Sequence, residues 1–336
     1  MKKKWIGLLV RIVISAGLIA YFMNALAKDE GGIVAAAERF VWAFKSTSWQ
    51  WLFPALMLHL VGFSLTSLRW KILLAAQGAR ISFPRLFLSY FMASFFNIFL
   101  PSTIGGDVVR AYDSTRITGK GAQSVIVVII ERLTGFVALV LIAGVAFLMY
   151  LSIGVEQKRF IWFFLGLALV GIFGLIVVAH PRIAHSILRV LKRILPGKIQ
   201  AFAEKSYAAI ETYYRHPFSL AAAQCVSIVF QLNMVLYYVL IAKALNQNPS
   251  FIDFAMKIPI MIFLLMTVPA INGIGVRTAS FRELMKFPKE FALAGEFVDL
   301  GMRIGLGLLG GFVFLFHRHK RPDVETKEKE DGVRLA

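Results

Sequence analysis

Eight apolar segments run along this chain, and they constrain its fold more than any other feature. They cover about residues 5–23, 50–68, 83–100, 122–151, 160–179, 218–241, 251–269 and 290–316. Most of them reach the ~20 residues that an α-helix needs to cross ~30 Å of hydrocarbon. Only 17% of the 336 residues are charged, and the mean hydropathy is +0.70. The segments therefore predict an all-α integral membrane protein, with a single polytopic domain over residues 1–320.

The charge and cysteine content exclude several classes of function. The formal net charge is +18, but the basic residues lie at the ends of apolar segments rather than on a face that also carries exposed aromatic residues. This placement is typical of membrane orientation and not of nucleic-acid binding. Cys225 is the only cysteine, which excludes an intrachain disulfide and a thiolate metal cluster. We expect no nucleic acid, no metal and no cofactor.

The polar regions between the segments indicate how the chain lies in the membrane. Three N-terminal lysines precede segment 5–23 and resemble the start of a signal peptide, but Arg11 interrupts the apolar run, so we favour an uncleaved first helix. Residues 33–44 have the periodicity of an amphipathic surface helix. Residues 182–216 carry seven basic and two acidic residues, which predicts cytoplasmic surface helices. The mixed charges of residues 321–336 predict a disordered tail.

Two glycine-rich, proline-containing loops match each other at a fixed spacing. The first begins at Pro101 and leads to Glu131, and the second begins at Pro269 and leads to Asp299. Both pairs lie 168 positions apart (269 − 101 and 299 − 131). Duplicated units with broken apolar segments are typical of secondary transporters that bind substrate within the membrane. We predict repeat units of about residues 83–151 and 251–316.

Charge placement favours an inverted arrangement of these units. If the lysine-rich N-terminus is cytoplasmic and every segment crosses, the basic region 182–216 falls outside the cell. The conflict disappears if segments 83–100 and 251–269 are re-entrant, turning at the two prolines. Three crossings then separate the hairpins, so that they enter from opposite faces and both termini are cytoplasmic. The alternative is eight plain spans with a parallel repeat.

The loops and the charged residues after them are the candidate site. Irregular backbone at membrane depth is tolerated where protein or water satisfies it, and glycine permits tight turns whose N–H groups can face an anion. Charges inside apolar segments are costly and are expected to be paired or to face a polar cavity. The candidate substrate-binding and translocation residues are Asn97, Pro101, Gly105, Gly106, Asp107, Arg110, Glu131, Arg132, Asn272, Gly273, Gly275, Arg277, Asp299 and Arg303.

Individual roles follow from position along the helices. Glu131 and Arg132 point about 100° apart on a helix, so we expect separate partners for them. Asp299 and Arg303 are four residues apart and are expected to pair. In the functional interpretation, Arg132 and Arg303 hold a lipid phosphate while the two acids act as counter-charges or proton carriers. The alternative is a structural ion network that braces the bundle.

Three further polar residues have expected roles of their own. We expect Asn97 and Asn272 to bond the broken backbone ends. Arg69 lies at the end of an apolar segment, and we expect it to reach the membrane interface.

These residues resemble the lysylphosphatidylglycerol synthase transmembrane-region family of flippase-like membrane proteins. The resemblance covers about residues 5–316 and is carried by four short motifs. They are Asn97 followed by Leu100-Pro101-Ser102-x-x-Gly105-Gly106-Asp107-x-x-Arg110, then Glu131-Arg132-x-x-Gly135, then Pro269-x-x-x-Gly273-x-Gly275-x-Arg277, and Gly310-Gly311. Many relatives carry an acidic residue soon after the arginine of the second loop, whereas here the next acid after Arg277 is Glu283.

The resemblance implies flippase-like lipid translocation across a bacterial cytoplasmic (inner) membrane. The implied substrate is an anionic or aminoacylated phospholipid, or another lipid-linked envelope precursor. We expect no soluble synthase domain and see no HExxH, GxSxG or Walker motif, so we expect no enzyme activity. The expected partners are membrane lipids and envelope-synthesis proteins. The alternatives are a non-catalytic membrane subunit of envelope synthesis and an intramembrane lipid-headgroup transferase.

Overall fold

The computed structural model describes residues 33–99, 105–152, 211–268 and 273–316, together with Ala270 and five isolated positions. Within these ranges all regular structure is helical, which confirms the all-α class. The helices are α2 (Ile33–Lys45), α3 (Trp49–Ala76), α4 (Phe83–Phe99), α5 (Gly105–Thr118), α6 (Gly121–Ser152), α10 (Pro217–Ala244), α11 (Phe251–Thr267), α12 (Val276–Ala279), the π-helix η3 (Ser280–Leu284) and α13 (Lys289–Phe316).

Several sequence-based expectations lie outside the described residues. They concern segments 5–23 and 160–179, most of region 182–216, the tail, and the loop residues Pro101, Pro269 and Asn272. The predicted amphipathic helix at residues 33–44 is present as α2. Its aromatic residues pack on α13, with Phe40 and Phe297 rings 5.3 Å apart and Trp42 and Phe291 rings 5.7 Å apart.

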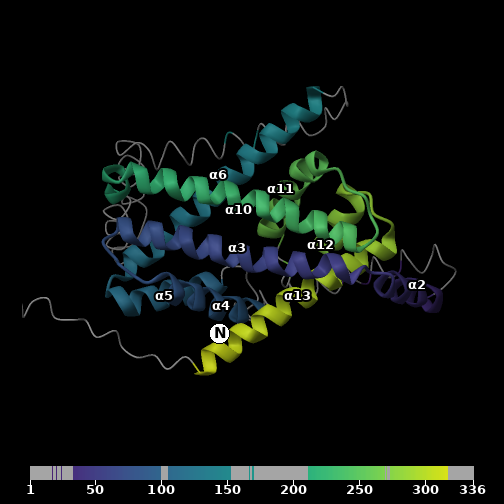
Figure 1. The fold of residues 1–336 in the computed structure, drawn as a ribbon, viewed down its shortest axis with the longest axis horizontal. Helices are drawn as coiled ribbons and strands as arrows, with labels where there is room; N and C mark the ends of the chain where they lie inside the picture. Colours follow the sequence, from purple (N-terminus) through teal and green to yellow (C-terminus); the bar gives the residue numbers. More distant parts are fainter. Residues whose placement is uncertain are drawn as a thin grey trace, which may run out of the picture.

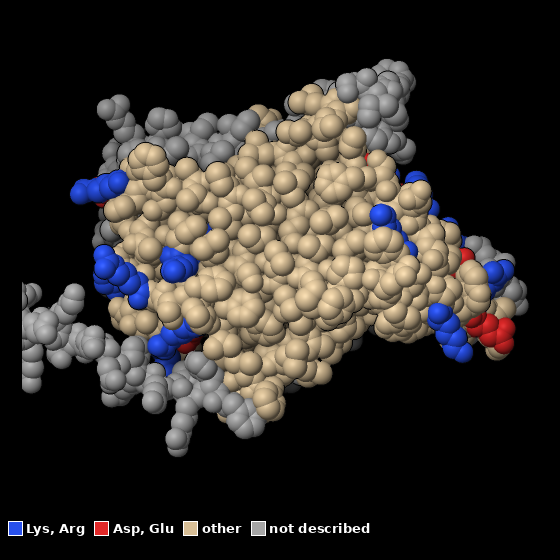
Figure 2. All heavy atoms as spheres, viewed as in Figure 1, with Lys and Arg blue, Asp and Glu red and all other residues tan. Residues whose placement is uncertain are grey.

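Four helices of the described part of the chain are long and apolar enough to cross a membrane. They are α3, α6, α10 and α13, and α3 and α10 lie side by side along the bundle (Figure 1). On the face drawn in Figure 2, lysine and arginine side chains gather toward the two ends and leave a broad uncharged band between them. This distribution suits a bundle whose middle lies in hydrocarbon and whose ends meet the headgroups.

The bounds of the helices repeat along the chain at the spacing of the two loops. Helices α3 and α10 each have 28 residues, and their first residues, Trp49 and Pro217, are separated by the loop spacing (217 − 49). Helices α4 and α11 each have 17 residues, and the same spacing separates them (251 − 83). The starts of α6 and α13 are again separated by this spacing (289 − 121). The repeat thus extends back to α3 and α10, ahead of the units predicted from the loops.

The repeat-related helices α3 and α10 run in opposite directions. The backbone N–H of Ser48, just before α3, donates to the carbonyl oxygen of Ala244 at the end of α10, at 2.7 Å. At the other end, the Tyr213 hydroxyl donates to the carbonyl oxygen of Leu73, at 3.1 Å. Helices related by a parallel repeat would point the same way, so this pair has the direction expected of inverted units.

The shorter helices form hairpins that return to the end of the bundle where they began. At the tip of the first, the Gly106 N–H donates to Asn97 Oδ1 at 2.6 Å. At its open end, Ile117 of α5 packs in one cluster with Ile81 and Leu86 beside the start of α4. Helix α5 therefore runs back along α4.

The second hairpin has the same form at the opposite end of the bundle (Figure 1). Leu265 near the end of α11 packs on Gly273 at the tip. At the open end, the Phe254 ring lies 6.3 Å from that of Phe287, which follows η3. Helices α11 and η3 thus leave and rejoin the same end.

The last helix of each unit packs against the hairpin of the other unit. Helix α13 approaches α4 so closely that a Cβ atom at Gly310 would overlap the carbonyl oxygen of Phe91. Helix α6 places Ala143 in the buried cluster that also holds Ala255 and Ile258 of α11. This exchange ties the two units into one bundle.

We expect Gly310→Ala to lower the free energy of unfolding by about 1–3 kcal/mol, because the added methyl overlaps the Phe91 carbonyl and pushes the two helix backbones apart. Thermal or denaturant unfolding of the purified protein in detergent measures this. Gly301→Ala is the matched control, since a Cβ atom there meets nothing within 4 Å on the same helix. Equal effects of the two substitutions would contradict the close packing of α13 on α4.

Candidate functional site

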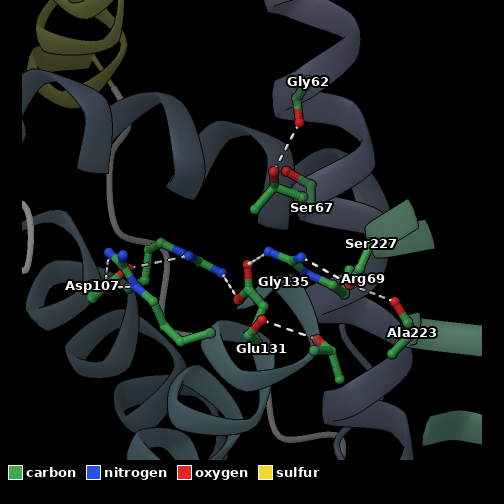
Figure 3. A network of polar contacts seen from close by, with 12 residues as sticks. Gly62, Ser67, Arg69, Asp107, Glu131, Gly135, Ala223 and Ser227 are labelled. Atoms are coloured by element: carbon green, nitrogen blue, oxygen red, sulfur yellow. Dashed lines mark hydrogen bonds and ion pairs between the residues drawn. The ribbon is translucent and has the colours of Figure 1, made fainter. Parts of the chain in front are cut away.

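Glu131 lies at the centre of an ion cluster formed by Arg69, Asp107, Arg110, Glu131 and Arg132, which we call the Glu131 cluster. All of its side chains except that of Arg132 are largely buried. Arg69 comes from α3, Asp107 and Arg110 from α5, and Glu131 and Arg132 from α6. Figure 3 shows the network around Arg69, Asp107 and Glu131. Arg69 Nη2 donates to Glu131 Oε1 at 2.9 Å, and Arg110 Nη2 donates to Glu131 Oε2. Both oxygens of the acid are therefore held by arginine.

Asp107 links the buried Arg110 to Arg132, which is the most exposed residue of the cluster. It accepts a bond from Arg132 Nε at 2.8 Å on one oxygen and from Arg110 Nη1 at 3.4 Å on the other. Glu131 and Arg132 thus have separate partners, as their positions on the helix predict. The predicted role of Asn97 at the broken backbone end is also confirmed, by its bond to Gly106.

The expectation that Arg69 reaches the membrane interface is wrong. The residue is 6% exposed, and besides its ion pair with Glu131 it donates from Nη1 to Ser227 Oγ of α10 at 2.9 Å. A buried arginine is stable only with a counter-charge and further hydrogen bonds, and both come from residues far away in the sequence. The position of Arg69 at the end of an apolar segment therefore could not predict these partners.

Aromatic rings and a glycine shape the space around the arginines. The Arg110 guanidinium lies 4.4 Å from the centre of the Trp70 ring and 4.9 Å from that of Tyr90, within cation–π range. Gly135 of α6 faces Arg69, and a Cβ atom there would lie 3.1 Å from Arg69 Nη1. Because residue 135 has no side chain, the Arg69 guanidinium can approach α6 closely.

A polar cavity of about 180 Å³ opens beside the Glu131 cluster. It is lined by all five residues of the cluster and by Thr66, Tyr90, Val128, Gly135, Phe136, Leu139, Phe230, Gln231, Ile262 and Met266. An apolar groove of about 400 Å³ adjoins it, lined by Asp107, Val108, Ala111, Val125, Val128, Ile129, Arg132 and Met266. Four lining residues are common to both spaces, so a polar chamber continues into an apolar one.

A second ion cluster surrounds Asp299 and consists of Tyr237, Arg277, Asp299 and Arg303. Asp299 Oδ1 accepts a bond from the Tyr237 hydroxyl at 2.7 Å. Its Oδ2 pairs with Arg303 Nε at 2.8 Å and with Arg277 Nε at 3.0 Å. The predicted pairing of Asp299 with Arg303 is thereby confirmed.

The two clusters occupy equivalent places in the repeat but differ in their side chains. At the repeat spacing, Asp299 corresponds to Glu131 and Tyr237 to Arg69 (299 − 131 and 237 − 69). The position of Gly135 is taken by Arg303, whose side chain is ion-paired to Asp299. A side chain therefore occupies, in the second unit, the position where the first unit has a glycine beside its cavity.

Glu296 is a buried residue of the second unit that sequence reasoning missed. Its Oε2 accepts bonds from the backbone N–H groups of Gly275 and Thr278, at 2.7 and 3.1 Å, and from the Thr278 hydroxyl at 2.5 Å. These bonds hold the second loop, where Gly275 has a φ of +82° that favours glycine. The repeat equivalent of Glu296 is Val128, so the duplication gives no signal. The sequence clue is its place inside the apolar segment 290–316, one helical turn before Asp299.

We expect Tyr237→Phe to lower the free energy of unfolding by about 1.5–3 kcal/mol, because a buried hydrogen bond to a charged group is lost. Thermal unfolding in detergent measures the change. Tyr112→Phe, at a residue that is 62% exposed on α5, is the control and is expected to be neutral. A neutral result for Tyr237 as well would mean that the hydroxyl does not support Asp299.

The long apolar helices, the hairpins and the buried ion clusters define a polytopic all-α membrane protein. The sequence matches the family described as Lysylphosphatidylglycerol synthase TM region over residues 8–296, and the chain belongs to this family. The match confirms the resemblance carried by the loop motifs. No curated protein and no solved structure matches the chain.

Proposed function

We propose that this protein translocates a phospholipid between the leaflets of a bacterial cytoplasmic membrane. The observation that carries the proposal is the polar cavity at the Glu131 cluster and its continuation into an apolar groove. A phospholipid has the same division, with a charged headgroup and hydrocarbon chains. Membership of a family named for a lipid synthase supports a substrate of this class.

The arginines of the cavity suit a phosphate group. Guanidinium groups donate in a fixed fork that matches phosphate oxygens, and such charge-assisted bonds are among the strong ones in proteins. Arg132 lies where cavity and groove meet, with 41% of its side chain exposed. We propose that it makes the first contact with the entering headgroup and that Arg69 and Arg110 hold it deeper in the bundle.

The pairing of Asp107 and Glu131 with arginines favours translocation of a lipid over a chemical reaction on it. Every carboxylate oxygen of Asp107 and Glu131 is paired with an arginine, which leaves neither acid free as a general base. We propose that the protein is not an enzyme. We also propose that the two hairpins are re-entrant from opposite membrane faces and that both termini are cytoplasmic, in keeping with their opposite directions and with the basic region 182–216.

Lipid movement in liposomes tests the proposal. Fluorescent anionic phospholipid is incorporated with purified protein, and dithionite bleaches only the label that reaches the outer leaflet. We expect wild-type protein to make the inner label accessible and Arg132→Ala to slow this by about tenfold or more, equivalent to ~1.4 kcal/mol. Arg282→Ala, which removes a charge on η3 away from the cavity, is expected to act as wild type. Bleaching no faster than in protein-free liposomes would overturn the proposal.

A further inference from the structure

The charges that line the cavity do not cancel. Three arginines, Arg69, Arg110 and Arg132, face two acids, Asp107 and Glu131, so the lining carries a net charge of +1 among the described residues. Four of these five residues have side chains that are at most 14% exposed. These four cancel one another, so the excess positive charge is that of Arg132, which is 41% exposed where cavity and groove meet. An entering anion neutralises this charge, whereas an entering cation adds to it.

The cluster also has more hydrogen-bond donors on its arginines than acceptors on its acids. All four carboxylate oxygens of Asp107 and Glu131 accept bonds from arginine. The Nε atoms of Arg69 and Arg110 are buried donors without a partner in the described part of the chain. The cluster therefore has arginine donors that no acid uses, whereas every carboxylate oxygen is already in use.

We infer that the site accepts lipids with an anionic headgroup and discriminates against cationic, aminoacylated headgroups. This inference rests on the proposed function and narrows its substrate. A phosphate without a neighbouring ammonium neutralises the net charge of the lining and can bond the exposed guanidinium of Arg132. A headgroup with a net positive charge raises the charge of the cavity, and its ammonium groups have to displace an arginine to reach a carboxylate.

A lipid headgroup and free inorganic phosphate both present a phosphate group to the arginines. The adjoining apolar groove favours the lipid. Val125, Ile129 and Val108 line this groove beside Arg132 and offer an apolar surface that free phosphate cannot use. A lipid therefore gains from both spaces. Free inorganic phosphate gains only from the arginines.

A comparison of translocation rates for lipids of different headgroup charge tests this selectivity. Liposomes with wild-type protein carry labelled phosphatidylglycerol, phosphatidylcholine or lysyl-phosphatidylglycerol on the same acyl chains. We expect the anionic lipid to move about tenfold or more faster than the cationic lipid, with the zwitterionic lipid between them. Equal rates, or faster movement of the cationic lipid, would overturn the inference.

A binding measurement separates this inference from the proposed function. The Trp70 ring stacks on Arg110, so its fluorescence reports on a ligand at the arginines, with Trp70→Phe as the signal control. We expect short-chain phosphatidylglycerol to bind more tightly than short-chain lysyl-phosphatidylglycerol and than inorganic phosphate. This result without any translocation would uphold the selectivity and overturn transport. Binding of inorganic phosphate as tight as that of the lipid, or of the cationic lipid as tight as the anionic one, would overturn the inference.

Arg132→Gln tests the role of the net charge itself. The substitution makes the lining neutral while Glu131 keeps both arginine partners. We expect the anionic preference, measured by binding and by translocation, to fall to less than about threefold. Arg282→Gln removes the same charge from η3 and is expected to leave the preference unchanged. An unchanged preference in Arg132→Gln would contradict the charge argument.

Discussion

Replacing Glu131 with alanine is expected to lower the free energy of unfolding by about 3–5 kcal/mol and to abolish lipid translocation. The side chain is buried and neutralises Arg69 and Arg110, which keep their charge when it is removed. Breaking a buried pair by removing one partner leaves an uncompensated charge, and that penalty has this size. Denaturant unfolding in detergent, followed by the liposome assay at matched incorporation, measures both effects.

Glu283→Ala is the control for this prediction, because that glutamate is exposed on η3. A double-mutant cycle with Arg69→Ala separates the ion pair from general damage to the fold. Removing Arg69 in addition to Glu131 takes away one of the uncompensated charges, so the double variant should be less destabilised than the sum of the single effects. Strict additivity would show that the two residues do not interact in the folded protein.

Gly135→Leu is expected to abolish translocation while the protein remains folded. The isobutyl group projects into the cavity against Arg69, and the cavity exists at this point because residue 135 has no side chain. We expect translocation of the anionic lipid to fall by at least about tenfold. Overpacking of this kind destabilises by about 1–3 kcal/mol, less than the loss of the Glu131 ion pair. The rate of dithionite bleaching and the unfolding midpoint are measured on the same preparation.

Gly144→Leu is the matched control for the cavity. It makes the same substitution in the same helix, but a Cβ atom at Gly144 meets nothing within 4 Å. We expect wild-type translocation from this variant. Loss of translocation in both variants would point to a general effect on α6, and retention in both would place the lipid pathway elsewhere.

The proposed division of roles between the two units rests on position 135 and its repeat equivalent, position 303. Arg303 stands where the first unit has Gly135, and it pairs with Asp299. In our interpretation the first unit holds the substrate cavity, whereas the Asp299 cluster braces the second unit. Tyr237 in place of Arg69 fits this division, since a neutral donor satisfies the acid and adds no charge for a ligand.

The sequence predicted the repeat from its prolines and charged residues. The shared spacing between the prolines and between Glu131 and Asp299 was visible because helix breakers and charges are rare in apolar segments. The sequence gives no such signal for α3 and α10, since residues that face lipid or core can be exchanged among apolar types without loss of the helix. Only the helix bounds reveal it.

The ion partners were predictable only over short distances. Asp299 and Arg303 are one helical turn apart, so the sequence alone predicted their pair. Arg69 and Glu131 are 62 residues apart, and their pairing depends on how α3 packs against α6. The contribution of Ser227 depends on the antiparallel packing of α10 on α3, which no local pattern encodes.

Photo-crosslinking of a bound lipid tests the central claim most directly. A phosphatidylglycerol analogue carries a diazirine either in its headgroup or on an acyl chain, and mass spectrometry locates the adducts on wild-type protein in liposomes. We predict headgroup adducts on cavity residues such as Phe230 and Gln231, and acyl adducts on groove residues such as Val125 and Ile129. Headgroup adducts confined to the lipid-facing apolar pocket around Leu141 and Leu232, with none in the cavity, would contradict the account.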